Sequence, residues 1–222
     1  SAYGLGMDDY DNPVRMLTLG KDNVDHWLRV LGNVYANLKI LKNLNFKTSM
    51  GLDYTNRDFI SVNKKYKEGG GKLNSINGVT TYAAKVTTTT WTNTLNYGLS
   101  LGKNQIDGVA GMEAIRYYIK DVNGSRNDLL FENSDYAYLN SATGVQSVSG
   151  GGDEYTMLSY FGKINYAYNS KYLLSATLRY DGSSKFGENN RFGFFPAVSA
   201  GWRISEEPFF QNVSVISDMK LR

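Results

Sequence analysis

The sequence predicts an all-β fold, a section of an antiparallel transmembrane β-barrel with about seven strands plus the start of an eighth. Three observations predict it. Apolar and polar residues alternate along several segments, which is the period of a β-strand. The connections between these segments are short and long in turn, as in a barrel with tight turns at one end and long loops at the other. Aromatic residues gather near the short turns, where membrane barrels carry aromatic girdles.

Composition agrees with this fold and excludes several classes of protein. Among 222 residues, 23 glycines, 17 tyrosines and only 3 prolines give a β-rich profile. No apolar run reaches the roughly 18 residues of a transmembrane helix. The net charge of +3 is not concentrated in a basic block, so nucleic-acid binding has little support. Without cysteine, the chain has no disulfides and no thiolate metal site.

The first predicted hairpin follows a polar N-terminal stretch. Residues 1–25 carry several aspartates and Pro13, and we expect a loop there. In residues 27–40 the even positions are nearly all apolar and the odd positions are mixed, which predicts a strand. A short turn at residues 41–43 leads into a second alternating segment, residues 44–54. The two segments form the clearest hairpin of the sequence.

Two more hairpins are predicted farther along the chain. Their strands and turns are residues 91–101, 102–104 and 106–114, and then residues 158–168, 169–171 and 172–180. Polar, glycine-containing composition predicts long connections between the three hairpins, at residues 56–85 and 116–154.

The C-terminal part continues this pattern. Residues 181–191 predict a loop and residues 194–204 another strand. Ser205, followed by two acidic residues and a proline, predicts a capped helical turn. Residues 219–222 alternate as the start of a further strand. Because the chain begins with Ser1 and stops within that strand, we expect an internal fragment of a longer protein.

The C-terminal stretch also resembles a known family. YLLSATLRYDGSSKFGENNRFGFFPAVSAGWRISEE, which begins at Tyr172, is similar to the barrel signature of SusC/RagA-family TonB-linked outer-membrane proteins. Recurrent barrel segments of that family are matched in order by RVLGN from Arg29, WTNTLNY from Trp91, GMEA from Gly111 and LSYFGK from Leu158. The resemblance implies a large plugged barrel of about 22 strands. Residues 1–222 are expected to be a partial barrel domain that lacks the plug, the TonB box and a signal peptide.

Function and partners follow from the resemblance alone. It implies part of a TonB-dependent transporter in the cell outer membrane of a Gram-negative bacterium, importing oligosaccharides or peptides. The implied partners are a SusD-like surface lipoprotein, the TonB complex, the imported substrate and outer-membrane lipid, with no nucleic acid.

The signature contains one loop that we consider as a site. Its members are Asp181, Gly182, Ser183, Ser184, Phe186 and Gly187. We expect a structural Asx-type turn, in which the Asp181 carboxylate caps nearby amides and Gly182 adopts a positive φ. Contact with a ligand is the alternative, and cations such as Arg179 could pair with Asp181.

Four tyrosines are the candidate ligand or lid contacts: Tyr117, Tyr118, Tyr136 and Tyr138. They lie in or beside the second long connection, and aromatic faces stack well on sugar rings. Packing of the loop against the barrel mouth is the alternative for all four.

No catalytic site, metal site or cofactor is expected, and we do not expect an enzyme. His26 is the only histidine, which leaves too few groups for a zinc site or a nucleophile and its base. Adjacent acids such as Glu206 and Glu207 would point to opposite faces of a strand. Glu113, on a polar face, is expected to form a structural ion pair.

Two other function classes stay open. One is a small free-standing β-barrel or β-sandwich that serves as a binding or adhesion protein of the cell envelope. It requires polar outward faces, whereas both strands of the first hairpin carry an apolar face of membrane-spanning length. The other is a β-rich glycan hydrolase, which needs two carboxylates facing one cleft. If the barrel is partial, the 222 residues should not fold alone, because lipid cannot satisfy two open sheet edges.

Overall fold

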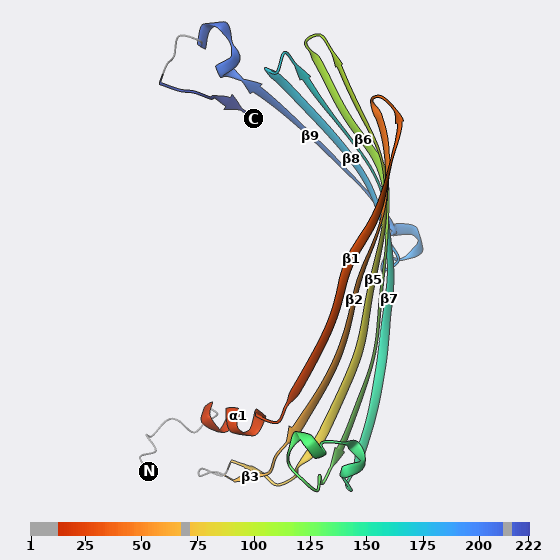
Figure 1. Cartoon of the computed structure of the whole chain (residues 1–222), viewed down its shortest axis with the longest axis vertical. Helices are drawn as coiled ribbons and strands as arrows, with labels where there is room; N and C mark the ends of the chain where they lie inside the picture. The colour runs from red at the N-terminus through yellow and green to blue at the C-terminus, as the bar shows by residue number, and fades with distance from the viewer. Residues whose placement is uncertain (1–12, 68–71, 211–214) are drawn as a thin grey trace. The chain divides into compact units, whose positions relative to one another are not determined.

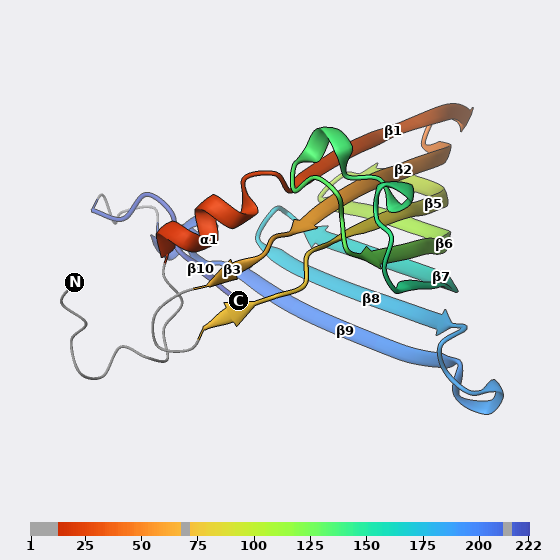
Figure 2. The same cartoon turned by 90° about the horizontal axis from the view of Figure 1, so that it is seen from below.

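Antiparallel strands dominate the structure, a computed structural model that describes residues 13–67, 72–210 and 215–222. One sheet has eight strands in the order β1-β2-β5-β6-β7-β8-β9-β10, and β3 and β4 form a separate small sheet (Figure 1). The strands are β1 (Val24–Leu41), β2 (Leu44–Asn63), β3 (Tyr66–Lys67), β4 (Leu73–Asn74), β5 (Gly78–Leu101), β6 (Asn104–Asn127), β7 (Gln146–Tyr168), β8 (Tyr172–Ser183), β9 (Phe192–Arg203) and β10 (Lys220–Leu221). Figure 2 shows the same order from a second side. The prediction of an all-β sheet with seven strands and the start of an eighth is confirmed.

The helical elements are short. They are α1 (Pro13–Gly20) and the 3-10 turns η2 (Ser134–Tyr136), η3 (Leu139–Ser141), η4 (Glu188–Asn190), η5 (Ile204–Glu206) and η6 (Pro208–Phe210). None of the helices in the described ranges is long and apolar enough to cross a membrane.

Each predicted short turn joins two long strands. Two residues, Lys42 and Asn43, connect β1 to β2, and Gly102 and Lys103 connect β5 to β6. The backbone is left-handed at Gly102, with φ 57°, and at Asn169 and Ser170, with φ 51° and 57°. Gly and Asn tolerate this region best, which explains their presence in these turns. The three hairpins predicted from alternation are confirmed.

The chain forms two compact units, and five of the long strands contribute residues to both. Unit 1 comprises Ser1–Val30, Tyr54–Thr87 and Tyr118–Asp153; unit 2 comprises Leu31–Asp53, Thr88–Tyr117 and Glu154–Arg222. Unit 1 contains a small apolar core of Val62, Val79, Leu129, Ala137 and Ala142. Ile60 and Leu139 pack against this core, so unit 1 buries apolar side chains as a water-soluble structure does.

The two long connections predicted from the sequence are shorter in the structure, because the strands beside them continue into unit 1. β2 continues to Asn63 and β5 begins at Gly78, so only residues 64–77 connect them, including β3 and β4; the glycines at 69–71 lie outside the described residues. Likewise, β6 continues to Asn127 and β7 begins at Gln146. Gly150 and Gly152 belong to β7, where a Cβ atom would lie 2.8 Å from a backbone oxygen of β6. These glycines permit close strand approach, which the prediction mistook for a loop signal.

Unit 2 exposes its apolar side chains and partly covers its polar ones. In β8, Tyr172, Leu174, Leu178 and Tyr180 are 44–52% exposed. The residues on the opposite face of β8, among them Ser175 and Thr177, are only partly exposed. A soluble β-sandwich would bury the apolar row and expose the polar row, so this arrangement favours a sheet whose apolar face meets lipid.

The apolar face continues across neighbouring strands in register. Ala176 lies opposite Ile164 of β7 and Val198 of β9. Aromatic side chains occupy both ends of the row. Near the short turn, Tyr168 and Tyr172 stack with ring centroids 6.4 Å apart. At the other end, the rings of Tyr180 and Phe192 stack at 4.8 Å. Two aromatic bands flanking an apolar one are typical of membrane barrels.

Two smaller predictions were wrong. Within the N-terminal stretch expected to be a loop, residues 1–12 lie outside the described residues, but Pro13 begins helix α1. Proline suits a first helical position because its φ is already helical and its missing N–H has no partner there. Ser205 is not a helix cap either: it lies inside η5, whose N-cap is Arg203 and makes no side-chain capping bond.

Candidate functional site

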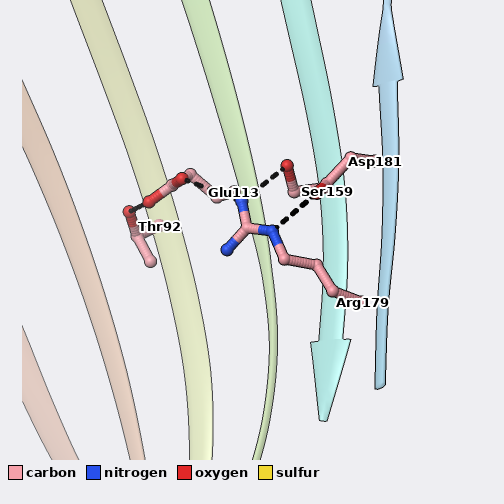
Figure 3. Close-up of polar contacts among 5 residues, drawn as sticks. All are labelled: Thr92, Glu113, Ser159, Arg179 and Asp181. Atoms are coloured by element: carbon pink, nitrogen blue, oxygen red, sulfur yellow. Dashed lines mark hydrogen bonds and ion pairs between the residues drawn. The ribbon is translucent and has the colours of Figure 1, made fainter. Parts of the chain in front are cut away.

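A network of polar side chains crosses four strands on the polar face of unit 2 (Figure 3). Its centre is Arg179 of β8. The Arg179 Nε donates to the two carboxylate oxygens of Asp181 at 2.7 and 2.8 Å. Its Nη2 donates to Ser159 Oγ of β7 at 3.1 Å. Ser159 is only 2% exposed, so its hydroxyl needs a hydrogen-bond partner within the protein, and the Arg179 guanidinium is one.

The network extends to β6 and β5 through a second carboxylate. Glu113 Oε1 lies 3.8 Å from Arg179 Nη2, and Thr92 Oγ1 donates to Glu113 Oε2 at 3.2 Å. The ion pair expected for Glu113 is therefore confirmed, with Arg179 as its partner. One cation between two carboxylates links β6 to β8 across β7 and balances the charges on the polar face of this sheet.

Small and aromatic residues next to the network fix its position. The Arg179 guanidinium carbon lies 5.8 Å from the ring centroid of Phe161, its partner on β7. A Cβ atom on Gly111 of β6 would lie 2.6 Å from the Phe161 ring. Glycine at this position therefore lets the ring lie over β6, and the ring in turn supports the guanidinium.

The signature loop divides between strand and loop. Asp181, Gly182 and Ser183 end β8, while Ser184, Phe186 and Gly187 precede η4. The Asp181 carboxylate accepts from the Arg179 side chain, and Gly182 does not have a positive φ. Gly182 is required for another reason: a Cβ atom there would lie 2.4 Å from the Phe192 ring. The Asx-turn prediction for these two residues is wrong.

The four candidate tyrosines fall into different environments. Tyr117, in unit 2, stacks on Tyr155 with centroids 4.8 Å apart, and Lys185 Nζ lies 4.5 Å from the Tyr155 ring centroid. In unit 1, Tyr118 is 39% exposed, Tyr136 53% and Tyr138 64%. The ring of Tyr136 contacts Phe131, while Tyr138 immediately precedes η3. The structure thus brings Tyr117 together with Tyr155, and leaves Tyr136 and Tyr138 with open ring surface in a loop.

The fold and the polar network agree with the comparison to known protein families. The family model described as TonB dependent receptor-like, beta-barrel matches residues 2–216. The chain belongs to this family.

Relatives and solved structures of TonB-dependent receptors support the assignment. The TonB-dependent receptor P39 of Formosa agariphila is 34% identical over 197 residues, which is 85% of this chain and 18% of the relative. The TonB-dependent receptor SusC of Bacteroides thetaiotaomicron is 31% identical over 214 residues, 95% of this chain and 20% of SusC. The RagAB peptide importer in its open-open state superposes with a TM-score of 0.76 at 25% identity, covering 90% of this chain and 22% of that one. The chain spans about a fifth of the length of these curated relatives.

This TonB-dependent receptor chain has a second polar centre, which sequence reasoning missed, beside the short turn between β7 and β8. Glu207, between η5 and η6, is 8% exposed. Its Oε1 accepts from the Tyr172 hydroxyl at 2.7 Å and from the Trp202 indole at 3.1 Å, and its Oε2 accepts from Lys171 Nζ at 3.1 Å. These hydrogen bonds, that of Tyr172 foremost, hold the pKa of Glu207 below its ordinary value. The carboxylate thus joins the polar ends of two girdle aromatics to the β9–β10 connection.

A pH-dependent loss of stability should follow from Glu207. Because its pKa is lowered in the folded state, its stabilisation is complete above the ordinary glutamate pKa of about 4.3 and disappears as pH falls through the folded-state value. In the complete receptor, Glu207→Gln should lower the urea midpoint at pH 7 and have less effect at acidic pH. Glu206→Gln, at the exposed neighbour, is the matched control and should leave the midpoint unchanged at both pH values. A loss of equal size at pH 7 and at acidic pH would contradict this account of the carboxylate.

Proposed function

We propose that this chain forms part of the barrel wall and extracellular loops of a TonB-dependent importer in the outer membrane of a Gram-negative bacterium. The observation that carries the proposal is the pair of faces in unit 2. One face presents exposed Tyr, Leu and Ala rows flanked by aromatic bands, and the other carries the paired charges of the Arg179 network. Lipid matches the first face, and a polar barrel interior matches the second.

The cargo and partners are proposed from the relatives. SusC is named as a TonB-dependent receptor and RagAB as a peptide importer. RagAB makes peptides one proposed cargo class. The resemblance of the signature to the SusC/RagA family adds oligosaccharides as the other class, a SusD-like surface lipoprotein as the proposed lid partner, and TonB as the proposed energy source. We keep Tyr117, Tyr118, Tyr136 and Tyr138 as candidate cargo or lid contacts, with Tyr136 and Tyr138 foremost because of their exposure. The signature residues 181–187 are proposed to be structural.

Uptake by cells that carry the complete receptor tests this proposal. Labelled oligosaccharides and labelled peptides of similar size should be taken up by cells with the receptor, and uptake should stop when TonB is removed. The receptor should fractionate with the outer membrane. Uptake that persists without TonB would contradict a TonB-dependent importer. Recovery of the receptor in the soluble fraction, without uptake, would favour a free-standing binding or adhesion protein.

A further inference from the structure

The two long connections of unit 1 meet at a polar cluster that has no part in the networks described above. Residues 64–77 connect β2 to β5, and residues 128–145 connect β6 to β7. Figure 1 draws both connections at the same end of the long strands. The second connection carries Tyr136 and Tyr138, the most exposed of the candidate tyrosines. The contacts between the connections therefore decide how these two side chains are held.

Asn77 lies at the centre of the cluster and is only 5% exposed. Its backbone oxygen accepts from the Asp128 N–H at 3.0 Å. Its side-chain Nδ2 donates to the backbone oxygen of Leu129 at 2.9 Å and to Glu132 Oε1 at 2.9 Å. One asparagine of the first connection thus binds three residues at the start of the second.

Glu132 attaches its connection at a second point. The same Oε1 accepts from the Lys65 backbone N–H at 3.0 Å, so the carboxylate holds both ends of residues 64–77. Lys64 forms an ion pair with Asp22, between α1 and β1, and these two side chains are only 12% and 16% exposed. Bonds to a charged group are stronger than bonds between neutral groups. The cluster thus joins three segments that are far apart in the sequence.

Apolar packing and hydrogen bonds have different effects on the β6–β7 connection. Ala137, directly after Tyr136, and Ala142 are buried in the small apolar core of unit 1. Apolar packing is non-directional, so it holds the connection against the core without fixing its rotation. The hydrogen bonds of Asn77 and Glu132 have defined directions, so they fix the orientation as well.

We propose that Asn77 and Glu132 are positioning residues, which hold residues 128–145 in one orientation. The two tyrosines of this connection are then presented to cargo without a prior ordering step. A loop that already has its bound conformation binds more tightly, because binding does not have to order it. The inference rests on the proposed function for the role of the tyrosines as cargo contacts, whereas the contact between the two connections does not depend on it.

Hydrogen exchange of the purified complete receptor in detergent, followed by mass spectrometry, tests that contact without any ligand. Asn77→Ala and Glu132→Met should each speed exchange of the amides in residues 128–145 about tenfold, because each removes a hydrogen bond to a charged group. Glu132→Gln keeps an oxygen acceptor and should have a much smaller effect. If Asn77→Ala does not fold, Glu132→Met makes the same test at a less buried position.

Asn74→Ala is the matched control, because Asn74 belongs to the same connection as Asn77. Its Nδ2 donates to Asn63 Oδ1 at 3.2 Å and to the backbone oxygen of Lys64 at 2.7 Å, and neither acceptor is in the β6–β7 connection. This variant should leave exchange in residues 128–145 unchanged. If Glu132→Met leaves that exchange unchanged as well, the proposal is overturned.

Uptake by cells separates positioning from general stability. Uptake of labelled maltohexaose and of a labelled neutral hexapeptide is measured over a range of concentrations. For a probe that is taken up, Asn77→Ala should raise the half-saturating concentration severalfold and leave the maximal rate unchanged. Asn77 is buried, so this effect cannot come from a lost contact with cargo. A lower maximal rate at an unchanged half-saturating concentration would mean fewer folded receptors and would overturn positioning. Absence of TonB-dependent uptake by the unaltered receptor would count against the proposed function alone, because the exchange measurement still decides whether the two residues hold the connection.

Discussion

Replacing Ala176 with lysine is expected to lower the free energy of unfolding of the complete receptor in a lipid bilayer by about 2–4 kcal/mol. Ala176 lies midway between the aromatic residues Tyr172 and Tyr180 on the exposed apolar row of β8. Its partners in register are Ile164 and Val198. If this face meets lipid, the new ammonium group must enter the centre of the bilayer, where charge is least tolerated. Urea titration of receptor folded into vesicles, with the folded fraction read from its heat-modifiable mobility in gels, measures the effect.

Ser175→Lys is the matched control for this prediction. Ser175 is the adjacent residue at almost the same depth, but its side chain lies on the opposite face, where its partners in register are Asn165 and Ser199. In a polar interior the same charge is solvated, so the cost should stay well below that of Ala176→Lys. Equal costs at the two positions would contradict the assignment of the faces, and a larger cost for Ser175→Lys would reverse it.

Local alternation explains why so much of this sheet could be predicted from the sequence. Side chains of a strand alternate between its two faces, so the apolar face from Tyr172 to Tyr180 and the polar face opposite it could be predicted without any structure. The turn at Asn169 and Ser170 carried its own signal, because few residues accept a positive φ. Strand ends were less predictable. β6 and β7 continue into unit 1 with polar residues and glycines, and their pairing depends on backbone hydrogen bonds that need no apolar pattern.

The networks depended on contacts that sequence spacing does not encode. Asp181 and Arg179 are two residues apart on one strand, so they lie on the same face and their pairing could be expected. Glu113 lies on the polar face of its alternating strand, which indicated an ion pair. That Glu113 would meet Arg179 required the register of β6, β7 and β8, which is set by turns far away. Glu207 had no signal of this kind. It meets Tyr172 and Trp202 only because β8 and β9 pair and the following 3-10 turn folds back.

Removal of the Arg179 charge should also lower the free energy of unfolding of the complete receptor substantially. Arg179→Met keeps much of the side-chain length but leaves Asp181 and Glu113 without their shared cation and the buried Ser159 hydroxyl without this donor. The side chains of Arg179, Asp181 and Glu113 are 41%, 24% and 26% exposed, between the surface and buried extremes. We therefore expect a loss of about 1–3 kcal/mol in the free energy of unfolding, more than for a surface pair and less than for a fully buried one.

A double variant separates the ion pair from simple packing. Because much of the loss in Arg179→Met is the cost of an uncompensated Asp181 carboxylate, adding Asp181→Asn should restore part of the stability. Lys185→Met is the matched cation control: it removes a charge that lies over the Tyr155 ring at 4.5 Å, and its cost should stay below about 1 kcal/mol. The same urea titration in vesicles measures these three variants and Asp181→Asn alone. If the double variant loses as much as the two single losses added together, the carboxylate and the guanidinium act independently, and the network does not hold β6, β7 and β8 together through charge.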